Sequence, residues 1–363
     1  MIKKVIISGG GTGGHIYPAI AIANALKAID PSIEILFVGA LGKMEMEKVP
    51  KAGYEIIGLP ISGIKRELSL DNLSFPIKLT RSLLKARSII NSFKPDVAIG
   101  VGGFASGPLL MIASLMGIPT LIQEQNSYAG ITNKLLAKRA RAICVAYPHM
   151  EAFFPKNKLK LTGNPVRSDI LNVEHKRQQA YEHFGLQPNR KTLLVIGGSL
   201  GAKTINESIE AGLKLIIESG YQILWQTGKP YADKAKSAVE NLKTAYVKTS
   251  DFIYEMDLAY ALADVVVSRA GALSVSELCL VAKPAILVPF PFASEDHQTK
   301  NAMSLVEQNA ALLVKDKDAK EELVQTALRL LQDTAKQREL SINIKKLAKP
   351  DAATDIAQAI LQL

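Results

Sequence analysis

The chain has 363 residues, of which 48% are hydrophobic and 21% are charged. This composition supplies enough apolar material for about two domains and excludes disordered and collagen-like chains. The two cysteines, Cys144 and Cys279, are too few and too isolated for a disulfide framework or a zinc site. They predict a reducing, cytoplasmic setting, and the N-terminus lacks the apolar stretch of an export signal.

The net charge of +10 is distributed unevenly along the chain. Residues 1–163 hold 20 lysines and arginines against 10 acidic residues, whereas residues 164–363 hold 24 of each sign. This asymmetry predicts an anionic partner for the first half, either a nucleic acid or an anionic membrane surface. Solubility and chance are the alternatives that remain open.

Apolar runs bounded by glycine-rich turns predict strands that alternate with amphipathic helices. In chain order, the predicted strands are residues 4–8, 33–38, 97–101, 120–123, 142–145, 193–196, 222–226, 265–268 and 285–289. The alternation predicts an α/β fold, with parallel sheets covered by helices on both faces. Residues 97–123 carry no charge and are long enough to cross a bilayer, but their glycines and prolines predict strand, loop, helix and turn instead.

The two halves of the chain begin alike. Residues 5–14 and 194–202 are each an apolar strand that runs directly into a glycine-rich turn, as at the start of a Rossmann-type domain. The stretch 153–165 is rich in turn residues, so we place the domain boundary between residues 163 and 164. A last helix is predicted after Asp351, a plausible N-cap, with Ile356, Ile360 and Leu363 on one face.

Glycine-rich loops begin at Gly9, Gly102 and Gly197. The first satisfies the dinucleotide fingerprint formally, but no acidic residue ends the second predicted strand, which argues against NAD. Loops of this kind present backbone N–H groups at helix starts and favour phosphate or another anion. His15 directly follows the first loop. An imidazole there is either a structural residue, a general base or a hydrogen-bond donor to a phosphate.

Two acidic segments lie in the second half. Glu277 lies a few residues after a turn of small residues, where it can accept ribose hydroxyls or simply stabilise the helix dipole. Asp316, Lys317 and Asp318 imitate a metal-binding Asp-x-Asp motif, but their lysine-rich surroundings predict a solvated surface.

Several motifs occur in the order found in one bacterial family. They are residues 9–15 (Gly-Gly-Gly-Thr-Gly-Gly-His), 102–108, 123–126, 163–167, 197–202, 269–272 and 296–298. On these motifs, the chain resembles the MurG-type N-acetylglucosaminyltransferases of peptidoglycan synthesis, in glycosyltransferase family 28, over essentially its full length. The resemblance implies a GT-B fold, with two Rossmann-like domains whose parallel sheets face each other across a cleft. It assigns the acceptor and the membrane to residues 1–163, with helix 351–363 packing back on them, and UDP-N-acetylglucosamine (UDP-GlcNAc) to residues 164–350.

The resemblance also implies site residues. Donor contacts fall on Thr12, Gly13, Gly14, Asn126, Arg167, Ser199, Ile253, Ala272, Leu273, Ser274, Val275, Ser276, Glu277 and Gln298. The acceptor patch falls on Gly102, Gly103 and Ser106. In the basic and apolar segment 64–87, Lys78, Arg81 and Lys85 share one helical face by their spacing. This pattern predicts either a buried helix with one solvated basic face or, with a lipid-linked acceptor, a membrane-docking patch. Two positions depart from the family: Gln123 stands where a histidine is common, and Leu200 where a glutamine is common. The first departure argues against any mechanism that requires that histidine, and the second leaves the backbone donors in place.

The implied reaction moves GlcNAc from UDP-GlcNAc to the C4 hydroxyl of N-acetylmuramic acid in lipid I, forming lipid II. An α-linked donor and a β-linked product require inversion, and therefore a base on the acceptor oxygen, for which His15 is the candidate. No metal or cofactor is expected, because helix N-termini would stabilise the departing UDP.

The expected partners are UDP-GlcNAc, lipid I and the anionic inner face of the cytoplasmic membrane, to which the enzyme would bind peripherally. No nucleic acid is expected, and other cell-wall synthesis proteins are further candidates. A UDP-sugar 2-epimerase and a non-catalytic binding protein are the alternatives.

Overall fold

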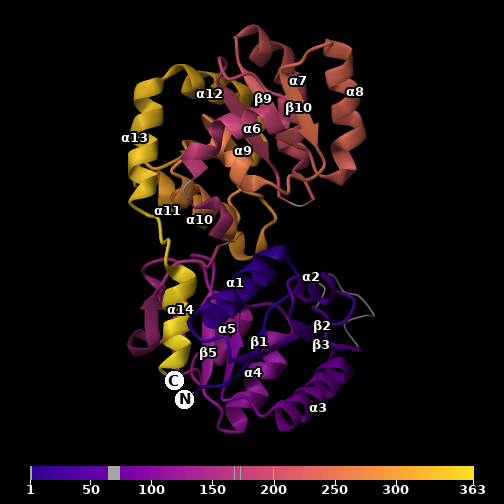
Figure 1. Cartoon of the computed structure of the whole chain (residues 1–363), viewed down its shortest axis with the longest axis vertical. Coiled ribbons are helices and arrows are strands. Elements are labelled where there is room, and N and C mark those ends of the chain that lie inside the picture. Colours follow the sequence, from indigo (N-terminus) through magenta and orange to yellow (C-terminus); the bar gives the residue numbers. More distant parts are fainter. Residues whose placement is uncertain (1, 64–73, 167, 172, 199) are drawn as a thin grey trace. The chain divides into compact units, whose positions relative to one another are not determined.

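The computed structural model describes residues 2–63, 74–166, 168–171, 173–198 and 200–363. The chain forms two compact units, unit 1 (Met1–Arg167 and Lys349–Leu363) and unit 2 (Ser168–Ala348). Each unit is a parallel sheet with helices on both faces (Figure 1). The predicted α/β class is therefore confirmed.

Unit 1 contains a seven-stranded sheet in the order β3-β2-β1-β4-β5-β6-β7. Its strands are β1 (Lys4–Ser8), β2 (Glu34–Ala40), β3 (Glu55–Leu59), β4 (Val97–Gly100), β5 (Thr120–Glu124), β6 (Ala142–Val145) and β7 (Leu159–Leu161). Its helices are α1 (Gly13–Ile29), α2 (Glu45–Lys51), α3 (Phe75–Phe93), α4 (Ser106–Leu115), α5 (Ile131–Leu136) and α14 (Ala352–Leu361). The strands β1 and β4 lie side by side, with Ile7 opposite Ile99.

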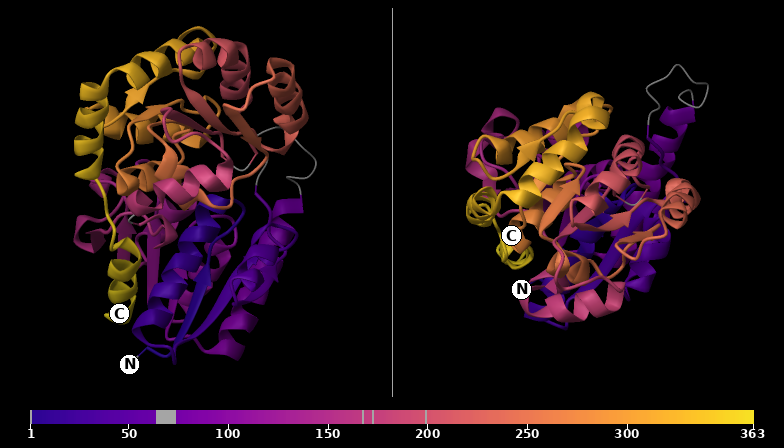
Figure 2. Two further views of the ribbon diagram at one scale, coloured as in Figure 1. Left: turned by 45° about the horizontal axis from the view of Figure 1, so that its top comes forward. Right: turned by 90° about the horizontal axis from the view of Figure 1, so that it is seen from above.

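The two faces of the unit 1 sheet are covered by different helices. Buried side chains of α3, α4 and α5 form one core cluster with the sheet, and those of α1 and α14 form another. The helix α14 packs against α1 (Figure 2). Ile356 and Ile360 of α14 are fully buried, as predicted, but the helix ends before Leu363, which is 36% exposed. Asp351 occupies the N-cap position, yet its side chain makes no capping hydrogen bond.

Unit 2 contains a six-stranded sheet in the order β10-β9-β8-β11-β12-β13. Its strands are β8 (Thr192–Ile196), β9 (Gln222–Gln226), β10 (Val247–Ser250), β11 (Val265–Ser268), β12 (Ala285–Leu287) and β13 (Leu312–Leu313). Its helices are α6 (Arg177–Phe184), α7 (Lys203–Glu218), α8 (Ala232–Leu242), α9 (Met256–Leu262), α10 (Ala272–Val281), α11 (His297–Val306), α12 (Ala319–Gln332) and α13 (Thr334–Lys345).

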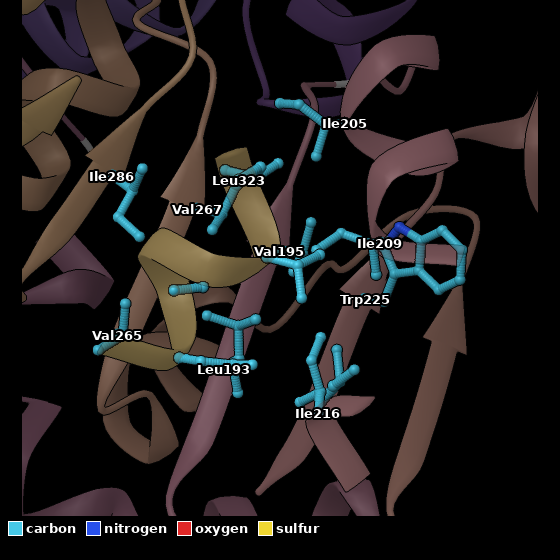
Figure 3. Packing of buried hydrophobic residues seen from close by; sticks show 14 of the residues in the cluster. Leu193, Val195, Ile205, Ile209, Ile216, Trp225, Val265, Val267, Ile286 and Leu323 are labelled. Atoms are coloured by element: carbon cyan, nitrogen blue, oxygen red, sulfur yellow. The ribbon is translucent and has the colours of Figure 1, made fainter. Parts of the chain in front are cut away.

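Trp225 lies in the core of unit 2. Figure 3 shows its indole beside Ile209 of α7, among the apolar side chains of the central strands. The indole N–H donates to the side-chain oxygen of Asn206 at 2.9 Å, and the amide of Asn206 donates to the carbonyl of Thr227 at 2.7 Å. The buried polar atoms therefore hold α7 to the end of β9, because breaking either bond would strand a buried polar group.

The uncharged stretch of residues 97–123 forms β4, α4 and β5. This confirms the prediction of a strand, a loop and a helix over a membrane span. Among the residues that the structure describes, no helix combines the length and apolarity needed to cross a bilayer.

Candidate functional site

In unit 1, strand order reverses between β1 and β4, since β1 connects to β2 on one side while β4 and β5 extend the other. Ligands of open parallel sheets bind at the carboxyl ends of the strands on either side of such a reversal. The loop after β1 leads into α1, and the loop after β4 leads into α4. His15, in the first turn of α1, and Gly102, after β4, meet at this point.

The imidazole of His15 is held by its own loop. Its Nδ1 lies 3.1 Å from the carbonyl oxygen of Gly10 and 3.3 Å from the hydroxyl of Thr12. A carbonyl oxygen only accepts, so Nδ1 carries the proton in the bond to Gly10. The lone pair of a neutral ring then lies on Nε2, which is the nitrogen able to take a proton from a substrate.

Gly102 leaves space for the imidazole ring of His15. A Cβ atom at residue 102 would lie 2.6 Å from Cδ2 of that ring, and the backbone there has φ +94°. Both the space and the backbone conformation therefore require glycine. Ser106, another predicted acceptor residue, is buried and donates to the carbonyl of Gly103 at 2.8 Å, so its hydroxyl stabilises the start of α4.

The loop that carries Asn126 is fixed by a buried carboxylate. Glu124 is 2% exposed and accepts the backbone N–H of Asn126 at 3.0 Å. Its other oxygen accepts from the N–H of Gly130 at 3.0 Å and from the side-chain amide of Asn133 at 2.8 Å. Three donors from one short segment thus hold the loop, and the sequence analysis did not single out Glu124 for this role.

Gln123, one of the two departures from the family, belongs to a buried amide network. Its amide nitrogen donates to Asn164 at 3.0 Å, and Asn164 donates to the carbonyl of Gln125 at 2.9 Å. Gln125 donates in turn to Gln123 and to the carbonyl of Val101. The network links β5 to the loop after β4 with neutral groups, so the position of Gln123 is a structural one.

In unit 2, strand order reverses between β8 and β11. The segment after β11 leads through Gly271 into α10, whose first residues are small. The N–H groups of the first turn of a helix have no partner within the helix and carry the positive end of its dipole, which suits a phosphate. Ala272, Leu273 and Ser274 are partly exposed there, whereas the side chain of Val275 is buried.

Glu277 lies five residues into α10, about 7.5 Å along the axis from Ala272. Its carboxylate accepts a hydrogen bond of 2.9 Å from the hydroxyl of Tyr260, a fully buried residue of α9. The separation from the helix start suits a ribose next to a bound phosphate. Tyr260 is a second residue that the sequence analysis missed, because nothing in its local pattern marks an inward-pointing hydroxyl.

Asp316 corrects the prediction of a solvated Asp-Lys-Asp surface. Its side chain is 17% exposed and pairs with Arg269, which also donates to the carbonyl oxygens of Val288 and Pro289. The second carboxylate oxygen of Asp316 accepts from the hydroxyl of Thr204 in α7 at 3.0 Å. Asp316 therefore ties the loop after β11 to α7, and the prediction was wrong because its partners are distant in the sequence.

Other predicted donor residues have mixed placements. Gln298 accepts the N–H of Phe290 at 2.9 Å, so it fixes the loop before α11. Ile253 is 3% exposed, and its backbone N–H donates to the side-chain oxygen of Gln226 at 3.4 Å. Leu200, the second departure, is 80% exposed. Arg167 and Ser199 lie outside the described residues.

Both cysteines are buried. Burial raises the pKa of both Cys144 and Cys279 to about 12, so both remain thiols at neutral pH. In the described part of the chain, no group of three or more His, Cys, Asp or Glu residues could hold a metal ion.

The basic residues of the predicted patch on α3 differ in exposure. Arg81 and Lys85 are exposed, whereas Lys78 is half-buried and donates to the hydroxyl of Ser62 at 3.3 Å. Ile77 and Leu84, on the same helix, are 59% and 65% exposed. The residues of the preceding segment, 64–73, lie outside the described residues.

Known proteins resemble the chain over its whole length. Residues 5–145 match the glycosyltransferase family 28 N-terminal domain, and residues 192–356 match the C-terminal domain of that family. A Cytophaga hutchinsonii protein is 58% identical over 99% of this chain and 96% of its own length, and a Bacteroides fragilis protein is 55% identical over 99% and 95%. Both are named UDP-N-acetylglucosamine--N-acetylmuramyl-(pentapeptide) pyrophosphoryl-undecaprenol N-acetylglucosamine transferase.

Solved structures give the same picture. Acinetobacter baumannii MurG is 28% identical and superposes with a TM-score of 0.80, over 99% of this chain and all of the other. A UDP-GlcNAc 2-epimerase from Neisseria meningitidis is 15% identical with a TM-score of 0.70, over the full length of both chains. At that identity, the epimerase shows a shared fold and nothing more.

Proposed function

The chain belongs to glycosyltransferase family 28, and we infer that it transfers GlcNAc from UDP-GlcNAc to the N-acetylmuramyl unit of lipid I, forming lipid II for peptidoglycan synthesis. The observation that carries this conclusion is the 58% identity to a transferase of that name over 99% of the chain. A UDP-GlcNAc 2-epimerase shares the fold at 15% identity. Because the same fold carries both activities, the fold alone does not favour the epimerase.

We propose that unit 2 binds the donor. The N-terminus of α10 would face the pyrophosphate and Glu277 would accept the ribose hydroxyls, as the spacing along α10 allows. The charge that develops on the departing UDP would be stabilised by backbone N–H groups that are already oriented by the fold. The small residues before α10 support this proposal, because they let a phosphate approach the helix.

The transfer itself is an in-line displacement at C1 of the GlcNAc. The bond from C1 to the UDP oxygen breaks while a bond to the acceptor hydroxyl oxygen forms, and the configuration inverts. We propose that Nε2 of His15 takes the hydroxyl proton, because Nδ1 is committed to the carbonyl of Gly10. The same ring could instead bind a phosphate of the acceptor, and the two roles predict different kinetics.

We propose further that the outer surface of α3, α4 and α5 docks on an anionic membrane. Exposed apolar side chains occur on all three helices: Ile77, Leu84, Leu115, Ile131 and Leu135. These helices pack on one face of the unit 1 sheet, and Arg81 and Lys85 stand among the exposed residues. Apolar insertion combined with basic residues is how peripheral proteins bind such surfaces.

One assay separates the candidate functions. The protein is incubated with UDP-GlcNAc, with a short-chain lipid I analogue, and with both. A transferase releases UDP only when both are present. An epimerase would convert the nucleotide sugar alone, and a binding protein would release nothing.

A further inference from the structure

Glu45 is a buried carboxylate that no step of the proposed reaction uses. It is the first residue of α2 and is fully buried in unit 1. One carboxylate oxygen accepts the N–H of Gly11 at 2.9 Å, and the other accepts the N–H of Ala40 at 3.0 Å. The side chain thus connects the loop after β1 to the end of β2.

The bond from Gly11 places Glu45 one peptide away from His15. The Gly10–Gly11 peptide donates its N–H to Glu45 on one edge, and on its opposite edge its carbonyl accepts from Nδ1 of His15 at 3.1 Å. The carboxylate, the peptide and the imidazole therefore form one continuous chain of hydrogen bonds.

The surrounding glycines leave room for this arrangement. A Cβ atom at Gly10 would lie 2.2 Å from a carboxylate oxygen of Glu45, and one at Gly39 would lie 2.6 Å from its Cγ. A Cβ atom at Gly103 would lie 2.3 Å from the carbonyl oxygen of Gly10. Side chains at these three positions would displace either Glu45 or the carbonyl that contacts His15.

A peptide between two glycines has little intrinsic preference for one orientation, because glycine reaches both signs of φ at little cost. Gly11 has φ +87° here. If the peptide flipped, its N–H would face Nδ1 of His15, which would then have to accept, and the ring proton would move to Nε2. That tautomer could not remove a proton from a hydroxyl through Nε2.

We propose that Glu45 is a positioning residue that locks the Gly10–Gly11 peptide and, through it, the Nδ1–H tautomer of His15. The proposal rests on the proposed role of His15 as the general base. A carboxylate that orients a catalytic imidazole directly is known to matter greatly, since a wrong tautomer costs about 10⁴ in kcat in a serine protease. Here the same control is exerted through one peptide bond.

The first test measures the tautomer itself in the unmodified full-length protein. Nitrogen NMR distinguishes Nδ1–H from Nε2–H in each of the five histidines, and a His15→Gln variant assigns the signals of His15. We expect Nδ1–H at neutral pH. A ring protonated on Nε2 alone would overturn the proposal without any need for a variant at residue 45.

The second test uses Glu45→Gln, which keeps the shape but can accept from only one of the two N–H groups. We expect a mixture of His15 tautomers and a loss of about 10- to 100-fold in kcat, at or below the lower end of the roughly 10²- to 10⁴-fold that a general base supplies, because some molecules keep the active tautomer. The Kd for UDP should stay within about twofold, because UDP binding is assigned to unit 2. The matched control is Glu47→Gln, two residues along α2, whose carboxylate is 61% exposed and pairs with Lys51; its kcat should stay within about twofold.

A double variant separates positioning from a general structural role. In a His15→Ala background, Glu45→Gln should lower kcat by less than about threefold, because the group it positions is already gone. A full additional loss there would refute the proposal. If His15→Ala alone leaves kcat unchanged, the general-base role fails, while the tautomer measurement still decides whether Glu45 controls His15.

Discussion

Replacing Tyr260 by phenylalanine tests the donor site at the point where the structure is most specific. The hydroxyl of Tyr260 donates to Glu277 at 2.9 Å, and Tyr260 is fully buried. The variant removes one oxygen atom and leaves the packing of the ring intact. We expect weaker use of UDP-GlcNAc, because the carboxylate that would receive the ribose loses a hydrogen-bond donor that helps to orient it.

The structure bounds the size of the effect. A hydrogen bond to a charged group contributes about 1.5–3 kcal/mol, and Glu277→Ala should cost about 2–3 kcal/mol in kcat/KM for the donor. Tyr260 acts through Glu277, so its loss should cost less than that of the carboxylate itself. About 1 kcal/mol, or roughly a fivefold fall in kcat/KM, is the expected value.

The assay follows UDP release at saturating acceptor while the concentration of UDP-GlcNAc varies. The fall should appear as a higher KM at nearly constant kcat. In the Glu277→Ala background, Tyr260→Phe should add almost nothing, since residues that act through one contact are not additive. Tyr221→Phe is the matched control, because Tyr221 directly precedes β9, at the amino end of that strand, whereas Glu277 lies in α10, after the carboxyl end of β11. An equal loss with and without Glu277, or an unchanged KM in Tyr260→Phe, would refute the reasoning.

Three further outcomes follow from the described residues. His15→Ala should lower turnover by about 10²–10⁴ if His15 is the base, whereas a rise in acceptor KM alone, with the acidic limb of the kcat profile kept, would assign it to binding. Replacing Lys78, Arg81 and Lys85 together by glutamate should abolish binding to anionic liposomes at low salt while UDP-GlcNAc still binds. Each basic residue near such a surface contributes about 1 kcal/mol to binding. Persistent liposome binding would place the docking surface elsewhere. Burial lowers the pKa of Lys283 from 10.5 to about 8, so between these values the unfolded chain binds more protons than the folded one, and the unfolding free energy should rise with pH in that window. Comparing the wild type with Lys283→Met by denaturant unfolding from pH 7.5 to 10.5 measures this rise, and a flat difference would show that the amine is solvated.

The strands that sequence reasoning found and missed differ in one respect. All nine predicted strands are present, with ends shifted by up to two residues, and each of them has a neighbour on both sides. The four missed strands, β3, β7, β10 and β13, are the four sheet edges. Central strands of a parallel sheet are buried on both faces and are therefore continuously apolar, whereas an edge strand such as Val247–Ser250 tolerates lysine, threonine and serine. Hydrophobic patterning detects burial, so it detects the central strands of a sheet better than the edge strands.

The candidate sites divide in a similar way. The glycine loops, His15 and Glu277 could be selected from the sequence because each follows a strand with a recognisable pattern. Glu45, Tyr260 and Asp316 could not, because their roles depend on partners at distances of 34, 17 and 47 residues. A buried carboxylate or hydroxyl has the same local sequence signature as an exposed one, and only the folded chain shows which donor it meets.

Glu45 and Asp316 also change which ligands the loops after the strands are expected to bind. The sequence pattern alone predicts an anion site at each loop, because glycines expose backbone N–H groups. In unit 1, however, the N–H of Gly11 is already taken by the carboxylate of Glu45, so the glycines there make room for an internal anion. In unit 2, the carboxylate of Asp316 is paired with Arg269, which offsets its charge beside the start of α10. A phosphate would meet a negative carboxylate beside Gly11 in unit 1, and a carboxylate neutralised by Arg269 beside the start of α10 in unit 2. The electrostatics therefore favour proton transfer at His15 and pyrophosphate binding at α10.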